Sequence, residues 1–264
     1  MIIRQGEAFR EGYNVITSLD DSENDTQMEY GMLILKANQT HSDHQPKEKA
    51  YLLVKGKVIF EWEGHKIEVS RDSFLDENPC CLHVPAGVAI KVTSLRDDTE
   101  ISVSRTYNEK NFEPKFYSQE ECLTEPGGKG ELGEAALRSI RTVFDYSNAP
   151  AANLVVGEVV HYPGRWSSYP PHHHPQPEMY YYKFLPEQGF GYSELGDQVF
   201  KVKNNDVCII TDDVTHPQVA APGYAMYYIW VIRHLENNPW DKTRIYASEH
   251  LWLTEKGVKI WPDK

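Results

Sequence analysis

Residues 50–64, AYLLVKGKVIFEWEG, have the composition and the periodicity of a β-strand. Branched and aromatic side chains of the kinds enriched in strands dominate the segment. Within it, Val58, Phe60 and Trp62 form one alternating series, and the other series is Lys57, Ile59, Glu61 and Glu63. An alternation with a period of two predicts a strand with one buried and one more exposed face.

Five further segments have the same character and are separated by Gly, Pro, Asn or Asp. They are EISVSRTY (100–107), NLVVGEVVHY (153–162), EMYYYKF (178–184), DVCIITD (206–212) and YAMYYIWVIRH (224–234). Only residues 131–141, ELGEAALRSIR, could pass as a helix. Short strands joined by turn residues predict an all-β protein built as antiparallel sandwiches or barrels.

The chain divides near its middle. Residues 108–130 are polar and contain Pro114, Pro126 and a Gly-Gly pair, as in a connection between domains. We therefore expect an N-terminal β-domain at 1–107, a connecting segment at 108–135 and a C-terminal β-domain at 136–264. A faint internal similarity between the halves suggests two copies of one architecture.

Composition excludes some classes of function. The 264 residues carry a formal net charge of −12 and form no Lys/Arg cluster, so we expect no nucleic-acid partner. No apolar run reaches the length of a membrane span, and the first residues do not resemble a leader peptide, so we expect no membrane partner and a cytoplasmic location. An anionic substrate would need a local positive centre, and a bound metal ion is one way to supply it.

The histidine-rich stretch GRWSSYPPHHHPQPEMYYYKF, at 164–184, is the strongest local signal. His172 and His174 point to one face if this stretch is extended, and Glu178 shares their parity. His216 follows on a later turn. Two imidazoles, a carboxylate and a third imidazole suit one divalent ion (Zn, Fe, Mn, Ni or Co) and leave open positions. The alternative is a surface histidine tract with no ligand.

Aromatic residues gather near these four positions. Tyr180 and Tyr182 share the parity of Glu178, and Tyr228 lies on the last long strand. These rings are either ordinary core packing or the wall of a pocket whose phenols hydrogen-bond to hydroxyl groups.

Together, GRWSSYPPHHH, EMYYYKFLPEQGF, HPQVAAPGYAMYYIWVI and EHLWL resemble the 5-deoxy-glucuronate isomerase family of myo-inositol catabolism. That family is grouped with the uronate ketol-isomerases of the pectin pathway as bicupins. The resemblance implies a tandem cupin, in which each half is a small antiparallel barrel. It implies a metal ion on His172, His174, Glu178 and His216, and no complete metal site in the N-terminal half, where Ile90 stands in place of the last histidine.

The resemblance also implies an enzyme, an aldose–ketose isomerase that interconverts 5-deoxy-D-glucuronate and 5-dehydro-2-deoxy-D-gluconate. Such an enzyme moves a proton between neighbouring carbons and stabilises an enediolate. Tyr180, Tyr182 and Tyr228 are our candidates for catalytic pocket groups, with hydroxide on the metal ion as the alternative base. The candidates for binding the substrate carboxylate are Arg141, Lys183 and Arg233, although parity turns Lys183 away from Glu178.

Other functions remain open at this point. The same ligand set would serve an isomerase of a related uronate, or a metal-dependent epimerase, or a dioxygenase if the metal were ferrous iron. A non-enzymatic sugar-binding cupin would bind a ligand without turnover. The aromatic-rich β surface also suggests a homo-oligomer.

Overall fold

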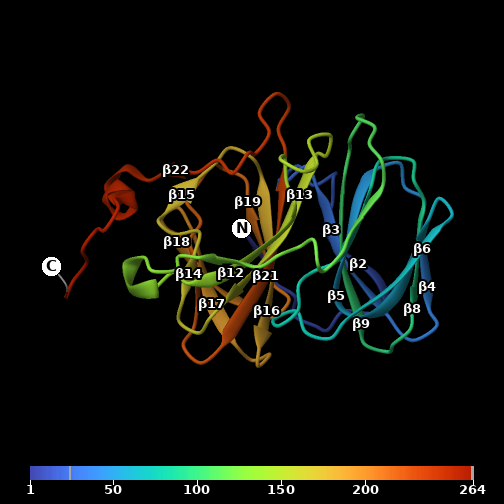
Figure 1. Ribbon diagram of the computed structural model, residues 1–264, viewed down its shortest axis with the longest axis horizontal. Helices are drawn as coiled ribbons and strands as arrows, with labels where there is room; N and C mark the ends of the chain where they lie inside the picture. Colours follow the sequence, from blue (N-terminus) through green and yellow to red (C-terminus); the bar gives the residue numbers. More distant parts are fainter. Residues whose placement is uncertain (24, 263–264) are drawn as a thin grey trace.

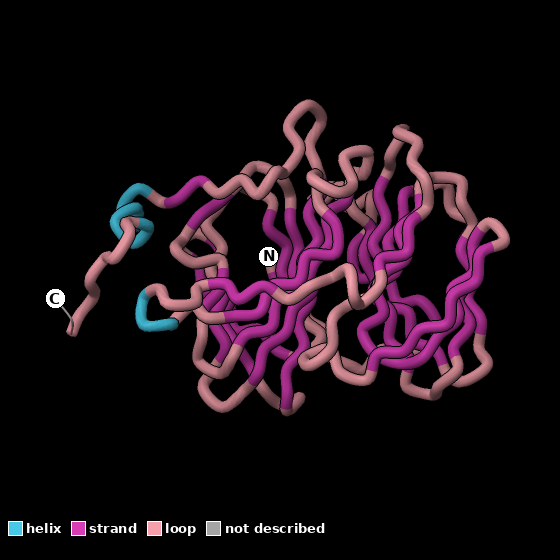
Figure 2. The backbone as a smooth tube through the Cα atoms, in the orientation of Figure 1, coloured by secondary structure: helices cyan, strands magenta, loops and turns pink. Residues whose placement is uncertain are grey.

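A computed structural model describes residues 1–23 and 25–262 of the chain. Figure 1 shows two β-rich halves side by side, with the N-terminal half in blue and cyan and the C-terminal half in yellow to red. Strands account for 47% of the residues and helices for 4%, which confirms the all-β prediction. Figure 2 shows how little of the backbone is helical. Every strand pair among the described residues is antiparallel.

The N-terminal half is one branched sheet that curls over a core of its own. Its strands are β2 (Gly12–Thr17), β3 (Glu29–Leu35), β4 (Thr40–Asp43), β5 (Glu48–Trp62), β6 (His65–Arg71), β7 (Cys81–Val84), β8 (Ile90–Ser94), β9 (Thr99–Thr106) and β10 (Lys115–Tyr117). As predicted, Val58, Phe60 and Trp62 of β5 are buried and alternate with less buried residues.

Gly56 is where β5 passes from one part of this sheet to the other. Before it, β5 pairs with β7 and β9, and after it with β6 and β8. Gly56 has φ of 122°, and a Cβ there would lie 2.5 Å from Thr99 Oγ1. Because only glycine tolerates this conformation and this close approach, the residue lets the long strand bend and close the sheet.

The C-terminal half contains the sheet that carries the site. Its central strands are β19 (Val207–Ile210), β16 (Glu178–Leu185), β21 (Ala225–Arg233), β13 (Leu154–His161) and β12 (Arg138–Phe144), in that order. A second sheet comprises β14 (Trp166–Ser167), β20 (Gln218–Ala220), β17 (Phe190–Leu195) and β18 (Gln198–Lys203). The pair β15 (His172–His173) and β22 (Ile245–Tyr246) lies beside them.

Alternation along β16 and β21 separates two cores. Tyr180, Tyr182 and Tyr228 face the interior of the C-terminal half. Met179, Tyr181 and the odd-numbered series of β21 face the other way, where they pack against residues of β3, β5 and β7 in a core shared by both halves. Burial on both faces explains why these strands are almost continuously apolar.

The structure differs from the sequence-based expectation in two places. Residues 131–141 do not form a helix: they contain a short 3-10 turn, η1 (Leu132–Glu134), and the start of β12. The boundaries between the parts are also less simple, because β1 (Ile2–Ile3) pairs with β19 of the C-terminal half. Within the connection, β10 joins the N-terminal sheet and β11 (Glu125–Gly127) joins the C-terminal one.

Ion pairs fill part of the N-terminal half. The Asp43 carboxylate accepts hydrogen bonds of 2.7 Å from Tyr51 and from Arg105, and Arg105 also pairs with Glu29. Lys49 Nζ lies 3.9 Å from the Asp43 carboxylate. The carboxylates of Asp43 and Glu29 are therefore neutralised by neighbouring cationic side chains.

The segment after β22 extends away from the sheets. In Figure 1 the part that includes η2 (Ser248–Thr254) runs outward from β22, up to residue 262. Among the described residues, no helix is long and apolar enough to cross a membrane.

Candidate metal centre

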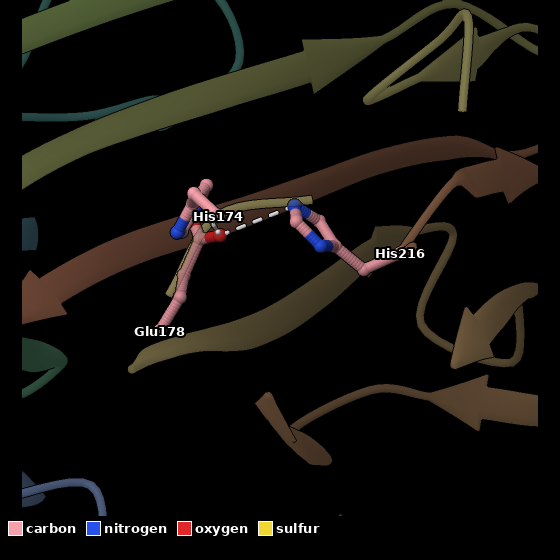
Figure 3. Close-up of side chains that lie close together, drawn as sticks. All are labelled: His174, Glu178 and His216. Atoms are coloured by element: carbon pink, nitrogen blue, oxygen red, sulfur yellow. Dashed lines mark ion pairs between the residues drawn. The ribbon is translucent and has the colours of Figure 1, made fainter. Parts of the chain in front are cut away.

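Three of the four predicted metal ligands meet in the C-terminal half. His174 follows β15, Glu178 opens β16, and His216 lies just before β20. Glu178 Oε2 is 3.3 Å from His174 Nε2 and 3.4 Å from His216 Nε2. Figure 3 shows the three side chains converging from separate segments. Among the described residues, this is the only group of three His, Cys, Asp or Glu side chains at metal-ligand spacing.

His172, the fourth predicted ligand, lines the same cavity but does not belong to the close group of three. Its ring centroid is 5.5 Å from that of His216. The pairing of β15 with β22 sets its position, because His172 lies opposite Tyr246. The structure therefore brings all four residues to one cavity.

Backbone carbonyls fix the orientation of all three imidazoles. The Nδ1–H groups of His172, His174 and His216 donate to the carbonyl oxygens of residues 170, 176 and 214, at 2.8, 3.0 and 2.9 Å. A carbonyl oxygen can only accept, so these bonds hold each neutral ring with the proton on Nδ1. The Nε2 lone pairs stay free to bind a cation, as is usual for metal-ligating histidines.

Burial favours the neutral form of two of these rings, His172 and His216. It is the main cause that lowers the pKa of His172 to about 3, and proximity to His216 adds to the effect. Burial likewise lowers the pKa of His216. Glu178 Oε2 is buried and has no hydrogen-bond donor. A buried carboxylate oxygen without a donor, facing neutral imidazoles, is a costly arrangement unless a cation sits among them, so the residues fit a divalent ion.

Aromatic rings form much of the cavity wall. The cavity has a volume of about 80 Å³, and Tyr180, Tyr228, Trp230 and Trp240 line it together with the histidines. Tyr180 and Tyr228 stack with centroids 4.4 Å apart. The Tyr180 hydroxyl lies 3.2 Å from Ser168 Oγ, and the Tyr228 hydroxyl lies 2.8 Å from Ser167 Oγ.

Burial keeps both phenols protonated at neutral pH. It raises the pKa of Tyr228 to about 12 and the pKa of Tyr180 well above its usual range. Neutral phenols donate hydrogen bonds but are poor bases. The two rings are therefore suited to hold a polar ligand rather than to remove a proton as phenolates.

Tyr182, the third predicted pocket tyrosine, is not among the residues that line the cavity. Its hydroxyl donates to Gln218 Oε1 at 2.6 Å, and Gln218 Nε2 donates to the carbonyl oxygen of His216 at 2.8 Å. Tyr182 therefore supports the segment that carries His216, and its place behind the wall differs from the predicted contact with substrate.

The three cations proposed from sequence to bind a carboxylate do not line the cavity. Arg141 donates to the carbonyl oxygens of Phe74 and Leu75, at the contact between the halves. Lys183 pairs with Glu100 on the face of β16 opposite Glu178, as its parity indicated. Arg233 is bound to Thr106 at 2.8 Å. Each of the three side chains is engaged elsewhere, and the structure does not place any of them at the cavity.

Two other arginines line the cavity, and the sequence did not single them out. Arg138 begins β12, in the segment interpreted as a helix, so its facing could not be derived from strand parity. Arg244 lies in an irregular segment before β22, where no periodicity applies. Treating 138–144 as a strand would have placed Arg138 on the face of Ile140, which also lines the cavity.

Comparison with known sequences assigns the chain to a protein family. The profile of the KduI/IolB family matches residues 1–253, which is nearly the whole chain. The chain belongs to the KduI/IolB family. This confirms the resemblance inferred from the sequence motifs.

Relatives of this KduI/IolB protein include named enzymes. It is 29% identical over 220 residues to the 5-deoxy-glucuronate isomerase of Geobacillus kaustophilus strain HTA426, with 76% of each chain covered. It is 24% identical over 273 residues to the 5-deoxy-glucuronate isomerase of Bacillus subtilis strain 168, with 96% of this chain and 97% of the relative covered. Both relatives are isomerases by name, in agreement with the expectation of an enzyme.

Solved structures confirm the fold. An IolB-like protein from Salmonella typhimurium superposes with a TM-score of 0.85 at 22% identity, covering 96% of this chain and 99% of that one. The oxalate decarboxylase of Lactobacillus farciminis superposes with a TM-score of 0.66 at 13% identity, covering 94% and 87%. The KduI/IolB chain is a tandem cupin, as the resemblance implied.

Proposed function

We propose that this protein is a metal-dependent aldose–ketose isomerase that converts 5-deoxy-D-glucuronate to 5-dehydro-2-deoxy-D-gluconate. The observation that carries the proposal is the buried cluster of His174, Glu178 and His216, open to a small cavity with phenol walls, in a chain of the KduI/IolB family. The substrate comes from the names of the relatives, and the cluster supports the chemistry.

The four residues His172, His174, Glu178 and His216 would hold one divalent ion. Such an ion supplies Lewis-acid stabilisation of charge that develops on substrate oxygens. The chain supplies the rest of the ligand geometry, because the carbonyl oxygens at 170, 176 and 214 keep each Nε2 available. Three nitrogen ligands and one oxygen ligand leave positions for a small ligand.

The cavity walls position the sugar acid. The hydroxyl groups of Tyr180 and Tyr228 act as neutral donors to substrate oxygens, and Ser167 and Ser168 orient them. Trp230 and Trp240 contribute apolar surface to the cavity wall. Donors that are held in place before the substrate binds stabilise the negative charge that builds on its oxygens.

The reaction itself tests the proposal. Purified protein is loaded in turn with Zn²⁺, Mn²⁺, Fe²⁺, Co²⁺ and Ni²⁺ and incubated with 5-deoxy-D-glucuronate, and ¹H and ¹³C NMR spectra are followed in time. We expect loss of the aldose signals and growth of the ketose signals with at least one metal. Unchanged spectra with every metal would refute the proposed reaction.

We predict that Tyr228→Phe lowers kcat about tenfold or more without loss of bound metal. The change removes one donor hydroxyl from the wall but keeps the stacked ring, and a donor aimed at developing charge contributes more in the transition state than in the ground state. Tyr192→Phe is the matched control, because Tyr192 is exposed and lies outside the cavity. Steady-state kinetics and metal analysis of both variants provide the measurement. Equal kcat in the two variants would contradict the role of Tyr228.

A homo-oligomer remains a prediction. The exposed side chains of Leu251, Trp252 and Trp261 on the C-terminal segment support it, because aromatic and other large apolar side chains are enriched where subunits meet.

A further inference from the structure

The metal cavity contains two cationic side chains that no carboxylate neutralises. Arg138 and Arg244 both line it. Among the described residues, neither has an acidic side chain within ion-pair distance, and the Arg138 side chain makes one hydrogen bond, from Nη1 to the Ala136 carbonyl oxygen at 2.8 Å. Most of the donors of both guanidinium groups are therefore available to a ligand.

The fully buried cations of the protein are all paired with carboxylates. Each buried lysine or arginine in the described part of the chain lies within 4 Å of a carboxylate; these residues are Lys49, Arg71, Arg105, Arg141 and Lys183. Partially burying a charge without a partner is unfavourable. Arg138 is half-buried, has no such partner and lines the cavity, so an anion that enters the cavity would stabilise its charge.

The fold holds Arg138 in place through β11 and β13. Arg138 pairs with Gly127 on one side and with His161 on the other. A Cβ on Gly127 would lie 3.2 Å from Arg138 Cζ and 2.7 Å from the Ile140 side chain. The absence of a side chain at Gly127 therefore makes room for the guanidinium group against the sheet.

Arg244 reaches the cavity from the C-terminal segment. It directly precedes β22, whose residue Tyr246 lies opposite His172 in the β15–β22 pair. The same two-stranded pair thus fixes a predicted metal ligand and the start of the segment that brings the second arginine.

Electrostatics support an anion at this position. Burial is the main cause that lowers the pKa of Arg138, and the nearby charge of Arg244 lowers it further. Two like charges that repel each other are stabilised when an anion binds between them. In a chain with a net charge of −12, this local positive centre also attracts an acidic substrate that the rest of the surface would repel.

We infer that Arg138 and Arg244 form the subsite that binds the carboxylate of the sugar acid, in the same cavity as the metal ligands. The inference rests on the proposed function for the identity of the substrate. A guanidinium group matches a carboxylate with two parallel hydrogen bonds, so the subsite selects acids over neutral sugars of the same shape. It also replaces the earlier candidates Arg141, Lys183 and Arg233.

Equilibrium binding tests this subsite without requiring turnover. Isothermal titration calorimetry on metal-loaded protein compares D-gluconate with D-glucitol, which has a hydroxymethyl group in place of the carboxylate. We expect the wild type to prefer D-gluconate by about tenfold or more. Arg138→Met and Arg244→Met should each weaken D-gluconate binding by about 10- to 100-fold and leave D-glucitol binding within about twofold. Arg138→Lys should keep part of the preference for D-gluconate, because lysine retains the positive charge but cannot donate two parallel hydrogen bonds.

Arg10→Met is the control, since Arg10 is exposed and lies outside the cavity. Arg244 is exposed, so its variant stays informative if Arg138→Met does not fold. A wild type without preference for the acid, or variants that keep the preference, would overturn the inference. If the preference is lost in the variants but no metal supports isomerisation, the subsite stands and the proposed reaction fails. If isomerisation occurs but the arginine variants keep the preference for D-gluconate, the proposed reaction stands and the subsite fails.

Discussion

Replacing His174 by alanine is expected to remove the bound metal ion and the isomerase activity together. The variant deletes one of three side chains whose ligand atoms lie within 4.8 Å of one another, and it leaves the Glu178 carboxylate with one imidazole of that group. It also removes the ring whose Nδ1–H donates to the carbonyl oxygen of Gln176. Loss of Lewis-acid stabilisation corresponds to several kcal/mol of transition-state free energy, so activity should fall by about 1,000-fold or more.

His173→Ala is a matched control for this variant. His173 is the neighbouring histidine, but its Nδ1 lies 2.6 Å from the Asp213 carboxylate and its side chain is 27% exposed, outside the cavity. We expect His173→Ala to keep nearly full metal content and activity. The measurement is metal-to-protein ratio by mass spectrometry together with turnover by NMR. Full activity in a His174→Ala protein shown to be free of metal would reject the metal dependence of the enzyme.

Glu178→Gln tests whether metal binding depends on the charge of the Glu178 side chain or only on its shape. The amide retains the volume of the carboxylate but lacks its charge and places a donor among the imidazoles. Metal affinity should therefore fall while the fold is kept, which circular dichroism can verify.

Strand parity was the part of the site that the sequence predicted well. Because side chains alternate along an extended chain, Tyr180 and Tyr182 were correctly placed on one face and Lys183 on the other. Glu178 was correctly placed with Tyr180, since both line the cavity. Strand parity does not predict, however, how far along the strand the cavity extends. Tyr182 lies beyond the cavity wall, bonded to Gln218, although it shares the face of Tyr180.

The cations show where reasoning from sequence stops. Whether an arginine faces a cavity or a neighbouring domain depends on tertiary contacts, and Arg141 and Arg233 are bound to residues 67 and 127 positions away. Arg138 was missed because 131–141 has the composition of a short helix, but pairing with β11 and β13 makes its second part a strand. Local propensity was overridden by sheet formation.

A buried ion pair joins the two halves of the protein. The Arg71 guanidinium, at the end of β6, donates to both oxygens of Glu158 on β13, at 2.6 and 2.8 Å. Arg141 Nη1 lies 3.6 Å from the same carboxylate, and the Tyr227 hydroxyl donates to it. The side chains of Arg71 and Glu158 are 0% exposed, so their charges depend on each other.

Glu158→Gln is therefore expected to lower the free energy of unfolding by about 3–5 kcal/mol, because it leaves the Arg71 charge buried without its counter-ion. Urea unfolding followed by fluorescence and by circular dichroism measures the change. Asp72→Asn is the control: it breaks the exposed pair between Asp72 and Arg96, which should contribute little. Similar midpoints for the two variants would show that Glu158 does not join the halves energetically.

The double variant Arg71→Met, Glu158→Leu distinguishes the strength of the pair from the cost of breaking it. Two apolar side chains of similar volume remove both buried charges, so the double variant should recover much of the stability lost in Glu158→Gln. Arg71 also donates to the carbonyl oxygens of Leu53 and Glu77, at 3.0 and 2.9 Å, and Met cannot replace those bonds. Arg141 and the Tyr227 hydroxyl also lose the Glu158 carboxylate in the double variant. Recovery should therefore be incomplete, and the remaining deficit combines these losses with the lost backbone hydrogen bonds of Arg71.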